Sequence, residues 1–516
     1  MPVENVSPPS AGSAHDFRRH MGHVSRHSTV FFAGTLFTAA AGYFFKVYLA
    51  RVLGAEALGI YALGMTIVGF LGIFNALGLP QSAVRFVAAY SATGKLEQLR
   101  GFLGHSLVAL TLSNAALGGV VLWIGPWIAT HFYHTPSLSS YLGLFVLIMV
   151  LGVMNTFLGQ VLAGYRDIAR RTVINSFVAT SLTIVFTLAL IAIGMGLRGY
   201  IAAQVGSAVV VLALMIASVR KLTPPAARSF SLHLPPVEKE VFAFSAVVFG
   251  MDFLAFLIAQ ADKVLIGVYL DARALGIYSV AAALVTFVPI VLQSVNQIFS
   301  PTIADLHARG ERALLGRMYQ TLTKWILGFT VPLAAVMIVF ARPLMRIFGV
   351  EFEAGWVILV IGTLGQLVNC AVGSVGYLLL MSGRQRALLR IQVVMAAVMV
   401  GLNLGLIPRW GISGAAVAAA LTNVLTNVWS LVVVRSELGL FPYNRSYARL
   451  LPPLGMSLAV LALVRVAFST LGPAWLVIAV SLLLAYVIFV GGCLLFSLDD
   501  DDRTIAQAAW RNLQNL

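Results

Sequence analysis

Apolar segments of roughly 20 residues recur along almost the whole chain, separated by short polar breaks. A helix of that length crosses the ~30 Å hydrocarbon layer of a bilayer. Hydrophobic residues make up 59% of the chain and charged residues only 10%, which excludes a soluble domain of ordinary composition. We therefore predict an all-α integral membrane protein with about 14 transmembrane helices. The expected spans are residues 28–50, 57–79, 102–125, 140–164, 172–195, 198–219, 241–269, 272–298, 321–341, 355–381, 386–407, 411–434, 450–470 and 473–497.

Lysine and arginine gather in alternate connections between these spans. Arg18, Arg19 and Arg26 precede the first span, whereas residues 130–140 contain neither lysine nor arginine. Because cytoplasmic loops are enriched in these residues, we expect both termini in the cytoplasm of a bacterial inner membrane. The concentration of basic residues in cytoplasmic connections then accounts for the net charge of +15. Nucleic acid is not an expected partner, since no soluble domain carries a basic patch.

The second half of the chain repeats the first at an offset of about 217 residues. Residues 53–61 recur as residues 270–278 with seven of nine positions identical, and Arg100 falls on Arg317. Each copy contains about six spans, an even number, so both copies enter the membrane from the same side. We predict two parallel six-helix lobes around a central cleft, with two further C-terminal helices.

This plan divides the chain into seven parts. They are the cytoplasmic tail 1–27, the first lobe 28–219, the cytoplasmic linker 220–240, the second lobe 241–434, the cytoplasmic loop 435–449, the last two spans 450–497 and the cytoplasmic tail 498–516. A cleft between repeated lobes can open to either side of a membrane, which is a transporter design.

Charged residues inside the expected spans are candidates for the transport pathway, because each costs roughly 2.5–3.5 kcal/mol to insert. Asp252 lies near the middle of the seventh span, and Lys263 follows three helical turns later on the same face. Lys46 occupies the position of Lys263 in the first copy. We expect Lys46 and Lys263 to contact an anion and Asp252 to couple or gate transport. Snorkelling of the two lysines toward the membrane surface is the alternative.

Arg85 follows the sequence Gly78-Leu79-Pro80, in which the proline ends or kinks the second span. Its fork of donors would suit a phosphate at the inner mouth of the cleft. An ordinary arginine of a cytoplasmic loop is the alternative interpretation.

A polar stripe on the eighth span could bind sugar hydroxyls or only join helices. It consists of Gln293, Asn296 and Gln297. No metal site is expected: Cys370 and Cys493 lie inside spans, and the run Asp499–Asp502 is interpreted as a solvated tail.

Several motifs together resemble the polysaccharide and lipid-linked oligosaccharide flippases of the multidrug/oligosaccharidyl-lipid/polysaccharide exporter superfamily. The resemblance covers nearly the whole chain. It rests on residues 49–54 and 58–61, Gly78-Leu79-Pro80 with Arg85, Pro301, Asn403 with Ile407-Pro408, and residues 411–416.

The resemblance implies export of an undecaprenyl-diphosphate-linked oligosaccharide for O-antigen, capsule or exopolysaccharide synthesis. It implies binding of the head group by Arg85, Lys46 and Lys263, with membrane lipids and the polysaccharide polymerase and assembly machinery as further partners. The chain is not expected to be an enzyme, so no catalytic residue and no cofactor are predicted. It contains no nucleotide-binding motif of the Walker type, so ATP hydrolysis is not expected.

Two alternatives remain open. A cation-coupled multidrug exporter of the same superfamily would need carboxylates in its cavity, and the spans offer chiefly Asp252 and Asp262. A membrane glycosyltransferase, polymerase or ligase would need a long outer loop with catalytic groups, whereas the outer loops here are short.

Overall fold

The computed structural model describes residues 11–228, 238–467 and 473–496. Within these ranges the chain is helical and contains no strand, so the fold class is as predicted. Some predicted parts lie outside the described residues: the first ten residues of the N-terminal tail, residues 229–237 of the linker, and the tail 498–516 with its aspartate run.

Eleven of the described helices are long and apolar enough to cross a membrane, or twelve if the bent pair Ala272–Val285 and Ile290–Gln297 is one span. Such a helix satisfies its backbone hydrogen bonds internally, as hydrocarbon requires. Two of them cover two expected spans each: α1 (Ala11–Ala76) and α16 (Gln385–Leu438). The protein is therefore a multi-pass membrane protein.

Breaks at glycine residues divide both of these long helices. Gly54 interrupts α1 with φ 80° and ψ 175°, and Gly411 interrupts α16 with φ 57° and ψ −140°. A residue with a Cβ atom rarely adopts such positive φ angles, whereas glycine does so without strain. The breaks lie at or close to the expected boundaries between spans, where hydropathy alone placed short loops.

The described chain forms two compact units. The first contains residues up to Val52, Ile67–His131 and Pro136–Phe253, and the second contains Leu53–Thr66, Phe132–Thr135 and the residues from Leu254 onward. Both α1 and α9 (Lys239–Tyr269) contribute to both units. The domain boundaries expected from the repeat differ from this division and stay a prediction.

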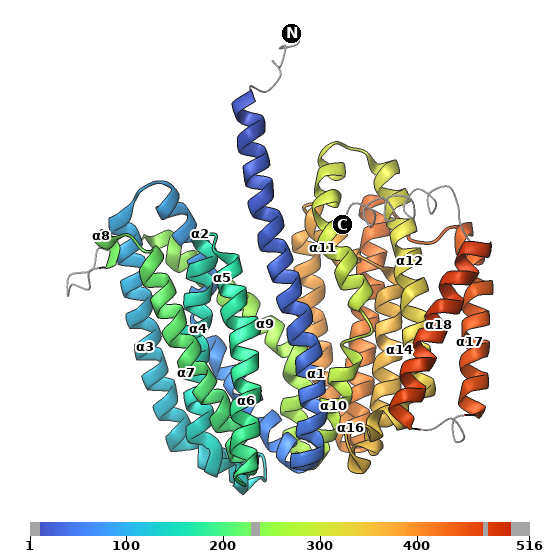
Figure 1. The fold of residues 1–516 in the computed structure, drawn as a ribbon, viewed down its shortest axis with the longest axis horizontal. Coiled ribbons are helices and arrows are strands. Elements are labelled where there is room, and N and C mark those ends of the chain that lie inside the picture. Colours follow the sequence, from blue (N-terminus) through green and yellow to red (C-terminus); the bar gives the residue numbers. More distant parts are fainter. Residues whose placement is uncertain (1–10, 229–237, 468–472, 497–516) are drawn as a thin grey trace. The chain divides into compact units, whose positions relative to one another are not determined.

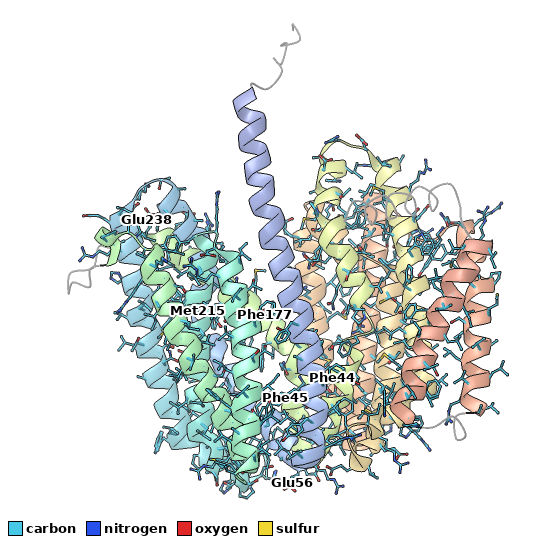
Figure 2. The ribbon with its side chains drawn as sticks, in the orientation of Figure 1. Phe44, Phe45, Glu56, Phe177, Met215 and Glu238 are labelled. Atoms are coloured by element: carbon cyan, nitrogen blue, oxygen red, sulfur yellow. The ribbon has the colours of Figure 1, made fainter. Side chains whose placement is uncertain are left out.

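The helices of the first unit surround one apolar core. Besides parts of α1 and α9, they are α2 (Leu79–Ala92), α3 (Leu96–Trp127), α4 (Leu142–Gly164), α5 (Ile168–Thr172), α6 (Ala179–Ala192), α7 (Gly196–Leu222) and α8 (Pro225–Arg228). Helices α3, α4 and α7 run side by side (Figure 1). Phe102, Phe157 and Met215 are buried at the centre, and Figure 2 labels Met215 on α7.

The second unit contains the remaining helices. They are α10 (Ala272–Val285), α11 (Ile290–Ala308), α12 (Arg312–Val339), α13 (Ala341–Arg346), α14 (Trp356–Val372), α15 (Val375–Met381), α17 (Leu451–Val466) and α18 (Ala474–Phe496), together with α16. Phe299, Tyr319 and Leu378 belong to its core. The last two helices, α17 and α18, pack as a pair (Figure 1).

The two copies of the repeated segment, residues 53–61 and 270–278, both belong to the second unit. Glu351 joins them: its carboxylate accepts a hydrogen bond from the Ala55 N–H at 2.7 Å and lies 3.5 Å from Arg273. In the second copy, Asp271 caps α10 by accepting a hydrogen bond from the Ala274 N–H at 2.7 Å.

Candidate functional site

Helix α2 and the first half of α9 meet closely within the first unit. Gly78 precedes α2 with φ 69°, and a Cβ atom at this position would lie 2.2 Å from the carbonyl oxygen of Ser245. One turn later the hydroxyls of Ser82 and Ser245 form a buried hydrogen bond of 2.7 Å. Glycine is required here by both backbone conformation and space, so Gly78 fixes where α2 begins against α9.

Polar residues extend from this contact in both directions along the two helices. We call the surface the α2–α9 strip; it consists of Gln81, Ser82 and Arg85 of α2 with Glu240, Ser245 and Asp252 of α9. Later residues of α2 pair with earlier residues of α9, so the two helices run antiparallel. The strip thereby brings Arg85 and Asp252, two of the predicted site residues, onto one pair of helices.

Arg85 forms an ion pair with Glu240, in which the guanidinium donates to the carboxylate. The two side chains are 49% and 58% exposed, so the pair is accessible to other ions. The guanidinium also lies over two aromatic rings, 5.3 Å from the centroid of Phe86 and 4.8 Å from that of Phe244. Such contacts stabilise a cation and orient its plane.

Asp252 lies at the other end of the strip and is half-buried. Its two carboxylate oxygens accept hydrogen bonds from Gln81 at 3.4 and 3.2 Å. On the strip, the carboxylate of Asp252 is therefore hydrogen-bonded by the neutral amide of Gln81. The expected coupling role of Asp252 stays a prediction.

Glu238 anchors the beginning of α9 to the neighbouring helices. Its carboxylate accepts hydrogen bonds from the Tyr90 hydroxyl of α2 and from Gln98 of α3, each at 3.1 Å. Figure 2 labels Glu238 beside the ends of these helices. Burial and the nearby Glu238 carboxylate raise the pKa of Tyr90 to about 12, so its hydroxyl remains a donor at neutral pH.

Lys263 lies in the second unit beside a buried carboxylate. Its ammonium donates to Gln260 at 2.8 Å, while its backbone N–H donates to Asp262 at 2.7 Å. The side chain of Asp262 also accepts a hydrogen bond from the Tyr278 hydroxyl, and Asp262 is only 7% exposed. The role of Lys263 as an anion contact stays a prediction.

Lys46 is half-buried in the part of α1 that belongs to the first unit. Aromatic residues neighbour it in the sequence: the rings of Phe45 and Tyr48 stack at 6.2 Å, and Phe45 meets Tyr200 edge-on at 6.1 Å. Its expected contact with an anion also stays a prediction.

The predicted polar stripe lies on α11 in the second unit. Gln293 and Gln297 are exposed, whereas Asn296 is 8% exposed and its Oδ1 atom has no hydrogen-bond partner. The structure thus separates one buried amide from two accessible ones, and sugar binding by this stripe stays a prediction.

Glu240, Glu238, Gln81 and Ser245 were not predicted as site residues. Glu238 and Glu240 lie at the end of a segment whose prolines and charges indicated a polar linker. In the sequence, these two glutamates are distinguished only by their position immediately before an apolar span. Glu240 lies one helical turn before Phe244, whose ring contacts Arg85.

Comparison with known proteins gives a family and a fold. The family model described as "Polysaccharide biosynthesis protein" matches residues 24–307, just over half of the chain. An uncharacterized membrane protein of Methanocaldococcus jannaschii is 21% identical over 389 residues, which cover 72% of this chain and 76% of that protein.

Solved structures share the fold at low sequence identity. A structure of the lipid II flippase MurJ in an inward closed conformation matches with a TM-score of 0.71 and 14% identity, covering 90% of this chain and 98% of that one. An inward-facing multidrug resistance transporter of the MATE family matches with a TM-score of 0.64 and 15% identity, covering 79% and 94%.

Proposed function

The chain belongs to the polysaccharide biosynthesis protein family, and from this premise we propose that it is a flippase for lipid-linked oligosaccharides. Its substrate is an undecaprenyl-diphosphate-linked oligosaccharide, which it moves from the cytoplasmic to the outer leaflet by alternating access. The product serves the synthesis of O-antigen, capsule or exopolysaccharide. The chain carries out transport and no covalent chemistry.

Arg85 is the observation that carries this proposal. The strip offers a half-exposed guanidinium oriented by two aromatic rings, on a membrane protein of this family. A planar fork of donors matches the oxygen atoms of a phosphate, and a diphosphate cannot enter hydrocarbon without such replacement of its hydration. Lys46 and Lys263 would add positive charge along the path.

The membrane potential favours the proposed direction. With the cytoplasm negative, each negative charge moved outward gains ~2.3 kcal/mol per 100 mV. Asp252, with only an amide as its hydrogen-bonding neighbour on the strip, would bind a coupling cation or proton in the same cycle. The polyprenyl tail can stay in lipid, while accessible amides such as Gln293 and Gln297 contact the sugars.

The proposal includes a location and partners. With an undecaprenyl-linked substrate, the location we propose is the bacterial inner membrane. We place both termini in the cytoplasm, because the basic residues alternate between connections. Its partners are the lipid-linked oligosaccharide, membrane lipids and the polymerase and assembly machinery that uses the product.

A cation-coupled multidrug exporter is the second candidate. The buried Asp262 with Tyr278, together with Asp252, supports it, since an exporter of organic cations needs intramembrane carboxylates. Arg85 and Lys46 argue for an anionic substrate instead.

Reconstitution distinguishes the two candidates. Proteoliposomes receive a fluorescent undecaprenyl-diphosphate oligosaccharide, and its exchange between leaflets is measured with and without an imposed potential. Exchange that depends on the protein supports the flippase. Absence of exchange with every glycan tested, together with cation-dependent efflux of an organic cation, would overturn it in favour of the exporter.

A further inference from the structure

Glu240 accepts from one nitrogen of the Arg85 guanidinium, Nη2, which a phosphate bound by the fork of donors would also use. The carboxylate accepts from the guanidinium, and both side chains are about half exposed, at 58% and 49%. Arginine binds carboxylate and phosphate with the same donors, so a phosphate that binds through Nη2 competes with Glu240 for this nitrogen.

We propose that Glu240 is a resident counter-ion of Arg85 that the diphosphate head group displaces, and that it thereby sets the affinity for the substrate. This inference rests on the proposed function. While no substrate is bound, the carboxylate of Glu240 neutralises the charge of Arg85. The diphosphate carries more charge and displaces the carboxylate.

Arg85 keeps its position when the carboxylate leaves. Its guanidinium lies 5.3 Å from the ring centroid of Phe86 and 4.8 Å from that of Phe244, and neither contact involves Glu240. Phe86 is buried in the core of the first unit, so this part of the binding surface is fixed. The fork is therefore pre-organised for an incoming anion.

Glu240 can leave by rotation of its own side chain. Glu238 holds the chain on one side through Tyr90 and Gln98 at 3.1 Å each, and Ser245 holds it on the other through Ser82 at 2.7 Å. Because the backbone is fixed on both sides of Glu240, exchange of one anion for another needs no movement of α9.

The repeat supports a specific role for this arginine. Position 302 in the second copy, which corresponds to Arg85 at the offset of about 217 residues, is a threonine. The duplicated fold therefore does not itself require an arginine at this position.

The test compares Glu240→Gln with the wild-type protein and with Glu97→Gln, which removes one acidic charge from an exposed position in the first turn of α3. An exposed ion pair is weak, so its loss should change the apparent affinity by about two- to fivefold. In proteoliposomes we expect Glu240→Gln to lower KM for the fluorescent undecaprenyl-diphosphate oligosaccharide by this factor without raising kcat. Glu97→Gln should keep the wild-type KM.

Binding of inorganic pyrophosphate to the full-length protein in detergent, measured by calorimetry, separates this inference from the proposed function. Tighter binding by Glu240→Gln and loss of binding by Arg85→Ala support the displacement even if no glycan is exchanged, and the flippase proposal alone would then fail. Unchanged or weaker binding by Glu240→Gln, or an equal gain in Glu97→Gln, would overturn the inference while leaving the flippase proposal intact.

Discussion

Gly59 and Gly276, equivalent positions of the two repeated segments, each pack against the backbone of the other segment. A Cβ atom at Gly59 would lie 1.5 Å from the carbonyl oxygen of Ala272, and a Cβ atom at Gly276 would lie 1.9 Å from that of Ala55. The contact is reciprocal, and both obstacles are backbone atoms of helices. The repeated motif therefore marks the place in the second unit where its own two copies cross with their backbones packed closely together.

Replacing either crossing glycine by alanine should destabilise the protein. Because a backbone carbonyl cannot rotate away, the helices must separate, and overpacking of this kind costs about 1–3 kcal/mol or more. We expect a lower melting temperature and less monodisperse protein for Gly59→Ala and for Gly276→Ala, measured by size-exclusion chromatography after heating in detergent. Gly72→Ala on the same helix α1 is the matched control, since a Cβ atom there meets nothing within 4 Å. Equal behaviour of Gly59→Ala and Gly72→Ala would show that the helices do not cross as described.

Glu351 should contribute to the same crossing through the Ala55 N–H. Glu351→Ala leaves this donor without its carboxylate partner, which costs about 1–3 kcal/mol for a buried group. Glu351→Gln keeps an acceptor and loses only the ion pair with the exposed Arg273, which costs at most about 1 kcal/mol. Thermal unfolding tests whether Glu351→Ala loses more stability than Glu351→Gln. Glu353→Ala, from the same helical turn, is the control. A larger loss for Gln than for Ala at position 351 would contradict it.

The fold class follows from the sequence because the bilayer leaves few alternatives to long apolar helices. Hydropathy marks which residues can lie in hydrocarbon, but it does not mark where a helix ends. For this reason α1 begins at Ala11, well before the expected span 28–50, and continues past Gly54 into the next span. The repeat predicted that Gly59 and Gly276 are equivalent, yet equivalence carries no information about contact.

The α2–α9 strip shows the same limit at the candidate site. Arg85 and Asp252 could be selected individually, since charge near or within an apolar span is rare. Their neighbours could not be selected, because Gln81 and Ser245 are ordinary polar residues. Their significance depends on contacts between residues 171 and 163 positions apart in sequence, made where two helices meet at Gly78. Glu240 carries no local pattern that distinguishes a partner of Arg85 from a solvated linker residue.

Tyr90 should make the stability of the protein sensitive to alkaline pH. Its folded pKa of about 12 lies above the ordinary value of 10, so between these values the folded state holds a proton that the unfolded chain has lost. Stability from this residue is thus fully present below pH 10 and falls as the pH rises toward 12. We expect the melting temperature of the wild type to exceed that of Tyr90→Phe at pH 8, and the difference to shrink by pH 11. Other tyrosines titrate equally in both proteins, so a constant difference would show that burial and Glu238 do not raise the pKa of Tyr90 in the folded protein.

Arg85 should contribute to substrate affinity through the geometry of its donors as well as through its positive charge. Loss of one charge-assisted contact corresponds to about 1.5–3 kcal/mol, or roughly ten- to a hundredfold in KM. We expect Arg85→Ala to raise KM for the lipid-linked oligosaccharide by this factor and Arg85→Lys to recover part of it, since lysine keeps the charge but loses the fork. Lys95→Ala, an exposed position between α2 and α3, is the control for removal of a nearby basic residue. Full recovery by lysine would show that only charge matters at this position.

Asp252 should determine the response of transport to a cation gradient. A proton that moves down a gradient of one pH unit supplies about 1.4 kcal/mol, so coupling of one proton can shift the steady-state distribution of substrate between the leaflets by up to about tenfold. Asp252→Asn keeps an oxygen that can accept from Gln81 but removes the ionisable group, so exchange should continue without a shift of the distribution by the gradient. Gln81→Ala removes the hydrogen bonds of 3.2 and 3.4 Å and keeps the carboxylate, so the shift should persist. Asp305→Asn, an exposed carboxylate of α11 paired with Arg309, controls for loss of negative charge. If the shift survives in Asp252→Asn and disappears in Asp262→Asn, the coupling group is the buried carboxylate beside Tyr278 in the second unit and not the one on the strip.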